Sequence, residues 1–196
     1  LVAGRHADLV DALVCELARQ ADALHGPAGR EEACAIAALG GYGRRELNPA
    51  SDVDLMFLHP RQVSPYLTGV LEHVLYVLWD LGFAVGHSCR SIGEAVAMME
   101  SDLTACTAML EARFLAGSPA VFAEFQARMW RSLQGRRADQ YIQGKLQERA
   151  QRHRRYGGSV YLQEPHVKEG PGGLRDFHAA LWVARARHHL EDVAQL

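Results

Sequence analysis

The stretch from Ile36 to Leu58 constrains the fold more than any other part of the sequence, because it joins two apolar runs through a glycine turn. Gly40-Gly41-Tyr42-Gly43 follows the first run, and a polar loop leads to a second run that carries Asp52 and Asp54. Successive side chains of a strand point to opposite faces, so the two carboxylates are predicted to share one face. The stretch therefore predicts two strands with a pair of acids beside a glycine turn.

This arrangement suits a site for a divalent metal and a phosphate. Glycine lets backbone amides approach a ligand's phosphates closely, and paired carboxylates are ligands for hard cations. An isolated Gly40-Gly41 pair is also typical of a structural turn. A second acid inside an apolar strand, however, costs burial energy that metal coordination would offset. The glycines match neither a P-loop, since no Gly-Lys-Ser/Thr follows, nor the dinucleotide-binding spacing.

Composition sets the broad class. The chain has 196 residues with 48% hydrophobic and 22% charged residues, which is normal for a globular protein. A net charge of −2 gives no overall attraction to nucleic acid or to an anionic membrane. The four cysteines form no Cys-x-x-Cys pair and no apolar run is long enough to span a membrane, so a cytoplasmic protein is expected. The chain opens with Leu, and we expect it to be a piece of a longer protein.

Helical periodicity is predicted at both ends and in the middle of the chain. Leucines and an alanine from Leu9 to Leu24 recur every three or four residues, and an apolar stripe runs from Tyr66 to Leu81. Phe83–Arg90 is predicted as a third strand, and the Ser91–Glu94 capping box opens another helix. Further helices are predicted from Asp102 to Gly117, with Phe114 inward, from Ser118-Pro119, and from Leu174, with Phe177, Leu181 and Ala184 on its inner face.

Between Arg128 and Arg155 the chain is strongly basic, with nine Lys or Arg against Asp139 and Glu148. This excess would suit phosphates or an acidic partner, and equally a solvated helix face. Its part around Lys145 to Arg155 lacks the interleaved aromatics that stack nucleic-acid bases, so nucleic acid is not the expected partner. His153 and His166 have no zinc-type spacing and are interpreted as surface or packing residues.

Leu39-Gly-Gly, a gap of about ten residues, and Asp-Val-Asp-Leu together resemble the signature of the DNA polymerase β-like nucleotidyltransferases. The longer string Gly-Gly-Tyr-Gly-Arg-Arg-Glu-Leu-Asn-Pro-Ala-Ser-Asp-Val-Asp-Leu is similar to the bacterial PII uridylyltransferases (uridylyl-removing enzymes). Val85-Gly86-His87-Ser88 and Lys168-Glu-Gly-Pro-Gly-Gly-Leu-Arg-Asp176 extend the likeness. The resemblance implies an α+β fold: a small mixed sheet flanked by helices in residues 1–110, then a helical region in 111–196.

The same resemblance implies the roles of individual residues. Gly40 and Gly41 would contact the nucleotide's phosphates, and Asp52 and Asp54 would hold Mg²⁺, with Mn²⁺ as a substitute. Ser51 would orient the triphosphate or the loop. Nucleotide or phosphate contacts are further expected of four basic residues, each with a structural or solvated alternative: Arg44, Arg45, Lys168 and Arg175.

Two departures from the family pattern bear on this assignment. The superfamily commonly adds a third carboxylate on a later strand, and the third strand here offers His87 and no acid. Either two acids suffice, or Asp80, Asp102 or Asp176 completes the site. Full-length family members also carry a metal-dependent His-Asp hydrolase domain and ligand-sensing domains, for which this chain is too short. Removal of UMP and glutamine sensing are therefore not expected of it.

The function predicted from these patterns is transfer of UMP from UTP to a tyrosine of the PII signalling protein. One alternative keeps the fold and changes the nucleotide or acceptor, giving an adenylyltransferase or a transferase acting on RNA or a small molecule. Another is a regulatory module that binds nucleotide without turnover, suggested by the missing third acid. No side chain selects uracil over adenine, so the base preference depends on the resemblance alone.

Overall fold

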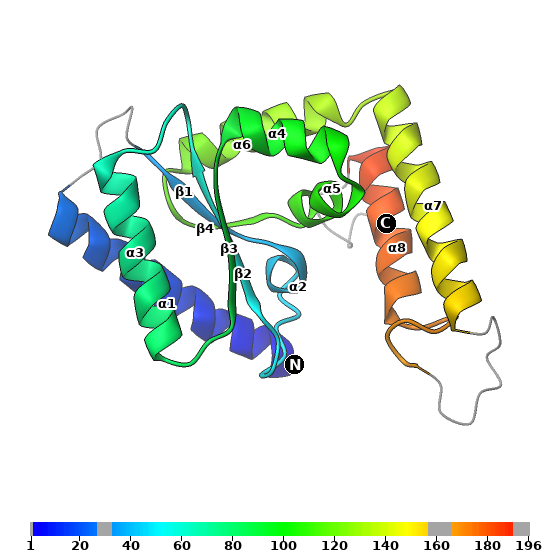
Figure 1. The fold of residues 1–196 in the computed structure, drawn as a ribbon, viewed down its shortest axis with the longest axis horizontal. Coiled ribbons are helices and arrows are strands. Elements are labelled where there is room, and N and C mark those ends of the chain that lie inside the picture. Colours follow the sequence, from blue (N-terminus) through cyan, green and yellow to red (C-terminus); the bar gives the residue numbers. More distant parts are fainter. Residues whose placement is uncertain (1, 27–32, 157–165, 190–196) are drawn as a thin grey trace. The chain divides into compact units, whose positions relative to one another are not determined.

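The computed structural model describes residues 2–26, 33–156 and 166–189 of the chain, which fold as the α+β protein that the sequence predicts (Figure 1). They form two compact units, unit 1 (residues 1–129) and unit 2 (residues 130–196). The elements of unit 1 are α1 (Val2–His25), β1 (Ala35–Ala38), α2 (Gly40–Gly43), β2 (Val53–His59), α3 (Pro65–Asp80), β3 (Val85–Ser91), α4 (Ile92–Ser101), α5 (Leu103–Leu110), β4 (Arg113–Gly117) and α6 (Pro119–Ser132), which runs into unit 2; those of unit 2 are α7 (Arg136–Arg155) and α8 (Leu174–His188).

Unit 1 is built on a mixed sheet with the strand order β3-β2-β1-β4. β1 runs antiparallel to both β2 and β4, whereas β2 and β3 are parallel. β1 is buried along its whole length and consists of small and branched apolar residues, as expected for a central strand. β2 ends at His59 because Pro60 cannot donate to the ladder, as the sequence predicts.

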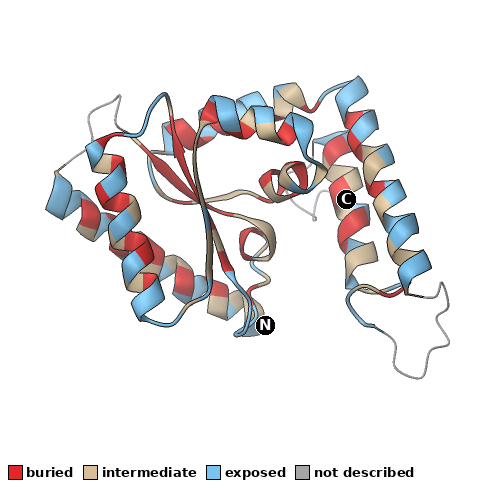
Figure 2. Ribbon diagram, in the orientation of Figure 1, coloured by how far each residue is buried: buried red, intermediate tan, exposed pale blue. Residues whose placement is uncertain are grey.

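Helices α1 and α3 pack together on one face of the sheet and form the main core with Val53, Leu55 and Phe57 of β2 (Figures 1 and 2). The predicted helices are confirmed, but the inner face of α1 is shifted. Leu9 and Leu24, predicted to point inward, are 71% and 67% exposed. Leu17 and Ala21 are buried as predicted, and the rest of the buried stripe is made of smaller residues: Ala7, Val10, Val14 and Ala18.

The helix predicted from Asp102 to Gly117 is too long. Asp102 caps α5 as expected, through its carboxylate and the N–H of Ala105, but the helix ends at Leu110. Residues 113–117 instead form β4, which pairs with β1 through a bulge. Gly117, with φ +86°, lies so close to the carbonyl of Cys34 that a Cβ would fall 2.3 Å from its oxygen. Strand pairing thus overrides the local helical pattern, and unit 1 extends well past the boundary expected at residue 110.

In unit 2, α7 and α8 pack side by side (Figure 1). α8 begins at Leu174 as predicted, but its buried face is made of His178, Ala179, Trp182 and Ala186. Leu174 and Phe177, predicted to face inward, are exposed. No helix in the described ranges combines the length and apolar character that crossing a membrane requires.

Candidate active site

The glycine segment folds as the short helical turn α2 directly after β1, and its glycines differ in their surroundings. Gly40 has φ +55°, a left-handed conformation that favours glycine. A Cβ added at Gly41 would make only ordinary contacts, the nearest being the Glu46 carbonyl at 3.6 Å. At Gly43 a Cβ would fall 2.1 Å from the carbonyl oxygen of Glu111. Gly43 is therefore required by packing, whereas packing does not exclude a side chain at Gly41.

The position of the turn is fixed by Arg113, the first residue of β4. The Arg113 guanidinium donates to the carbonyls of Gly43 and Tyr42, both at 3.2 Å, and forms a two-point ion pair with Asp11 of α1 at 2.8 and 3.0 Å. These bonds hold the two carbonyls at the end of the turn, of which that of Tyr42 also accepts from the Arg45 N–H at 3.1 Å. The glycine turn is thus a fixed part of unit 1, tied to both α1 and β4.

Asp52 and Asp54 lie at the start of β2, as the alternation predicts. Asp52 is exposed and immediately precedes the strand, while Asp54 is half-buried and Val53 and Leu55 are in the core. The Leu39 N–H donates to the carbonyl of Asp54 at 3.0 Å, which joins the glycine turn to the acid-bearing strand. Both carboxylates therefore face away from the core that α1 and α3 cover.

The Asp54 carboxylate lies between two glycines. A Cβ added at Gly40 would be 3.4 Å from Oδ2, and one added at Gly86 of β3 would be 2.3 Å from Oδ1. Gly86 is the register partner of Asp54 in the parallel β2–β3 pair. The neighbouring strand thus presents no side chain beside Asp54, and the carboxylate occupies the space that a side chain would need.

Asp52 and Asp54 are acids whose surroundings supply little positive charge among the described residues. In the described part of the chain neither is paired with a Lys or Arg side chain. Burial raises the pKa of Asp54 above its usual value, and the nearby charge of Asp52 raises it further. The fold thus keeps an acid where its ionised form is unfavourable, which a bound cation would correct.

The three candidates for a third acid lie elsewhere or have other partners. Asp102 caps α5, Asp80 is the last residue of α3, and Asp176 belongs to unit 2. Within the described ranges, no group of three or more His, Cys, Asp or Glu side chains is arranged to hold a metal. The acids that the structure brings together in unit 1 are Asp52 and Asp54.

Arg44 lies beside the glycine turn, but most of its side chain is already engaged. Its Nε donates to Glu46 at 2.9 Å, and Nη1 donates to the buried Glu111 at 2.5 Å. Its third nitrogen, Nη2, is directed toward Gly41, where an added Cβ would lie 3.8 Å away. Arg45 pairs with the exposed Asp8 of α1. Of the two arginines, Arg44 is the one positioned for a ligand at the turn.

Ser51 is exposed, in the loop before Asp52, and its N–H bonds to the Asn48 carbonyl at 2.9 Å. Gly40, Gly41, Arg44, Ser51 and the two acids all lie in unit 1, whereas Lys168 and Arg175 lie in unit 2. Their joint contact with one nucleotide stays a prediction.

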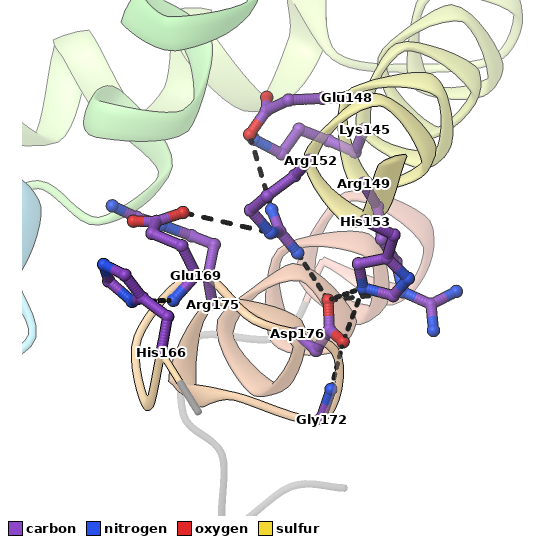
Figure 3. Close-up of polar contacts among 10 residues, drawn as sticks. All are labelled: Lys145, Glu148, Arg149, Arg152, His153, His166, Glu169, Gly172, Arg175 and Asp176. Atoms are coloured by element: carbon purple, nitrogen blue, oxygen red, sulfur yellow. Dashed lines mark hydrogen bonds and ion pairs between the residues drawn. The ribbon is translucent and has the colours of Figure 1, made fainter. Parts of the chain in front are cut away.

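The segment from His166 to Asp176 forms a compact double turn that leads into α8 (Figure 3). The N–H groups of Gly170, Leu174 and Arg175 donate to the carbonyls of His166, Val167 and Lys168, each at 2.8–2.9 Å. The Lys168 side chain is exposed and forms no ion pair with the described residues. Residues 157–165, which precede this segment, lie outside the described residues.

Asp176 ties this turn to α7. Its carboxylate accepts from the Gly172 N–H at 2.8 Å and from His153 Nε2 at 2.8 and 2.9 Å, and it pairs with Arg152 (Figure 3). Burial alone raises the pKa of this carboxyl, but the bonds from Gly172, His153 and Arg152 outweigh it and hold the pKa at about 2. Arg149 Nε adds a further contact at 3.3 Å. Asp176 is thus saturated by cations of its own chain.

Much of the basic run is used inside unit 2, so neither a wholly solvated face nor a free phosphate surface describes it. Lys145 is buried, with its ammonium 2.6 Å from Glu148 and 4.4 Å from the centre of the Trp182 ring. Arg175 lies 3.6 Å from Glu169 and also stacks near Trp182. These contacts join α7, the turn and α8.

Sequence reasoning missed the groups that support the site. Glu111 and Arg113 were expected in a helix, but Glu111 lies in the turn after α5, and Arg113 begins β4, which depends on pairing with β1. Arg149, Arg152 and His153 are spaced to share one face of a helix, a pattern that could have predicted an acidic partner. Gly86 carries no signal of its own, because only the register of β3 against β2 places it beside Asp54.

Comparison with known proteins decides the family. The family model for GlnD PII-uridylyltransferase matches residues 140–196. A relative from Novosphingobium aromaticivorans, described as a bifunctional uridylyltransferase/uridylyl-removing enzyme, is 47% identical over 165 residues, which cover 84% of this chain. The chain belongs to this family.

Other members of the uridylyltransferase/uridylyl-removing family extend the match. A relative from Erythrobacter litoralis is 44% identical over 194 residues, 97% of this chain, and one from Cereibacter sphaeroides is 45% identical over 182 residues, 91% of the chain. The matched parts are 18%, 21% and 20% of the Novosphingobium, Erythrobacter and Cereibacter proteins. This chain therefore spans about a fifth of the length of the curated relatives that it matches.

Proposed function

We propose that this chain carries the nucleotidyltransferase site of its family and transfers UMP from UTP to a tyrosine hydroxyl of the PII signalling protein, as part of nitrogen regulation. The observation that carries the proposal is the Asp52/Asp54 pair, which forms no ion pair with Lys or Arg among the described residues and lies beside the glycine turn. The names of the relatives support the choice of UMP as the transferred group.

The residues present fit Mg²⁺. Mg²⁺ prefers oxygen ligands and is usually bound through one or two carboxylates, with substrate phosphates and water completing its shell. Asp52 and Asp54 supply such a pair, and burial together with the charge of Asp52 raises the pKa of Asp54. A third protein carboxylate is not required in this proposal. Mn²⁺, with similar ligands, would substitute.

In the proposed mechanism the protein positions the triphosphate and balances its charge. The amides of Gly40 and Gly41 and the Nη2 group of Arg44 would bind phosphate oxygens, while the Ser51 hydroxyl orients the chain of phosphates. Asp52 and Asp54 would hold Mg²⁺, which would supply positive charge to lower the pKa of the attacking hydroxyl and to offset the charge of the leaving group. The tyrosine oxygen attacks the α-phosphorus in line, its P–O bond forms as the bond to pyrophosphate breaks, and the tyrosine proton leaves to solvent.

The direct test is to convert Asp54 or Asp52 to Asn and to measure UMP transfer to PII by intact-protein mass. We expect the rate to fall by about 1000-fold, equivalent to about 4 kcal/mol, because the metal would lose a charged ligand. Asp139→Asn, at an exposed pair with Arg187 in unit 2, is the matched control and should retain full activity. Transfer at the normal rate by folded Asp54→Asn protein would refute the assignment.

A nucleotide panel separates the proposal from its rivals. Transfer of AMP rather than UMP would indicate an adenylyltransferase, and UTP binding that is independent of Mg²⁺ and releases no pyrophosphate would indicate a regulatory module. Steeply salt-dependent RNA binding would favour an RNA acceptor. We place the reaction in the cytoplasm, which suits the four cysteines, all free thiols in the structure.

A further inference from the structure

We infer that Gly86 is a positioning residue for Asp54: it is glycine because the Asp54 carboxylate occupies the space that any side chain on β3 would fill at this point. The inference deepens the proposed function and rests on it for its catalytic consequence. The steric contact between Gly86 and Asp54 depends only on the geometry of β2 and β3.

The first step is steric. A Cβ at Gly86 would lie 2.3 Å from Oδ1 of Asp54 and 3.5 Å from its Cγ, and apart from its chain neighbours no other described residue has an atom within 4 Å. Carbon and oxygen cannot approach so closely, so one of them must move. The obstructing atom is the end of a side chain, and therefore the carboxylate would be displaced while the backbone of the strand remains in place.

The second step concerns the backbone. Gly86 is absent from the glycines with positive φ, which include Gly40, Gly82 and Gly117. Its extended conformation within β3 is one that other residues adopt freely. The requirement for glycine at this position therefore comes from Asp54 and not from backbone strain, which separates Gly86 from Gly43 and Gly117, where backbone atoms obstruct a Cβ.

The third step is the consequence for Asp54. Gly40 flanks the other carboxylate oxygen, with an added Cβ 3.4 Å from Oδ2. The carboxylate therefore lies between Gly40 at the start of α2 and Gly86 near the start of β3. A methyl group at Gly86 would turn it away from this position. A displacement of about 1 Å in a reacting group can cost about 100-fold in rate. Gly86 would thus control whether Asp54 can hold a cation together with Asp52.

The inference also explains the missing third acid. Asp54 and Gly86 are register partners on neighbouring parallel strands, so a side chain at Gly86 would project beside Asp54 on the same face. With Asp54 in its present orientation that space is taken. The strand that could have supplied another carboxylate instead supplies room for the one on β2.

The experiment is a double-mutant cycle of Gly86→Ala with Asp54→Ala, read by thermal unfolding of the 196-residue chain. In the presence of Asp54, Gly86→Ala should lower Tm by about 2–4 °C. In the Asp54→Ala background it should change Tm by less than about 1 °C, because the obstructing atoms are gone. An equal loss in both backgrounds, or no loss in either, would overturn the inference.

Activity provides the second readout. Gly86→Ala should lower kcat for UMP transfer by about 100-fold and weaken the dependence on Mg²⁺, with the KM for PII unchanged. Gly93→Ala is the matched control, since Gly93 lies in the first turn of α4 and a Cβ there meets nothing closer than Ser91 Oγ at 3.9 Å. Wild-type kcat in Gly86→Ala would contradict the positioning role.

The two readouts separate the inference from the proposed function. If the wild-type chain transfers no UMP with any metal, the proposed function fails while the unfolding cycle still tests the contact between Gly86 and Asp54. If the wild type transfers UMP and the cycle shows no coupling, the inference fails and the function stands.

Discussion

Asp54 in unit 1 and Asp176 in unit 2 are both acids next to a glycine turn, yet their carboxylates have neighbours of opposite charge. Asp176 is surrounded by Arg149, Arg152, His153 and the Gly172 N–H, and its pKa falls to about 2. Asp54 has a neighbouring acid in place of a cation, and its pKa is raised by burial and by that neighbour. The charge around each acid, rather than the nearby glycines, distinguishes an anchoring carboxylate from one available to a ligand.

The largest expected effect on stability comes from removing the anchoring charge. Asp176→Asn should lower the free energy of unfolding by about 2 kcal/mol at neutral pH, since the native pKa is about 2 against an ordinary 3.8. A lowered native pKa gives stability that is fully present above pH about 4 and is lost as pH falls through about 2. Urea denaturation at a series of pH values from 7 downward measures this difference.

Asp139→Asn serves as the control here too, because its ion pair is largely exposed and should contribute less than about 1 kcal/mol. A difference between wild type and Asp176→Asn that stays constant down to the lowest pH would mean that the carboxylate's charge is not the cause.

Lys168 and Arg175 sharpen the comparison within unit 2. Lys168→Ala should raise the KM for UTP about tenfold, or about 1.4 kcal/mol, and leave stability within about 0.5 kcal/mol, because its ammonium is exposed and has no described ion pair. Arg175→Ala should instead lower stability by about 1 kcal/mol, since Arg175 pairs with Glu169 and stacks near Trp182. Steady-state kinetics measures the KM for UTP of both variants, and urea denaturation measures their stability. An unchanged KM in Lys168→Ala would limit nucleotide binding to unit 1.

The smallest effect concerns the stability cost of Asp54. Its raised native pKa means that the folded protein binds this proton more tightly than the unfolded chain, so ionised Asp54 is destabilising at neutral pH. Asp54→Asn should therefore be more stable than wild type, by less than about 1 kcal/mol. This gain should disappear as pH falls and Asp54 becomes protonated. Adding UTP with Mg²⁺ should raise Tm of the wild type and not of the variant. The opposite pattern would contradict the conclusion that Asp54, unlike Asp176, is available to a ligand.

The parts of the fold that depend on local pattern were predictable. The alternation around Asp52 and Asp54, the Ser91–Glu94 capping box and the Pro119 start of α6 are all set by residues close in the chain. β4 was not predictable, because a short apolar segment around Phe114 fits a helix equally well and only pairing with β1 selects a strand. The inner faces of α1 and α8 were misjudged because large leucines suggest burial more strongly than the alanines that the close packing selects.

The candidate site, like the fold, was predictable only where it depends on local sequence. The acids and glycines were visible as a motif, whereas their surroundings depend on the tertiary structure. Arg113 beneath the turn, Glu111 on Arg44 and Gly86 beside Asp54 come from distant parts of the chain. The spacing of Arg149, Arg152 and His153 could have predicted an acidic partner, but only the tertiary structure shows that this partner is Asp176.

The pairing of β4 with β1 has a consequence for the order of folding. Ala35 pairs with Gly117, and Arg113 reaches back to Tyr42 and Gly43, so the glycine turn depends on contacts across most of unit 1. Such distant contacts form late, because the intervening chain must first be brought together. During synthesis on the ribosome, β1, the glycine turn and β2 emerge long before residues 111–117, which contact the turn. The glycine turn should thus become rigid only when nearly the whole of unit 1 has left the ribosome.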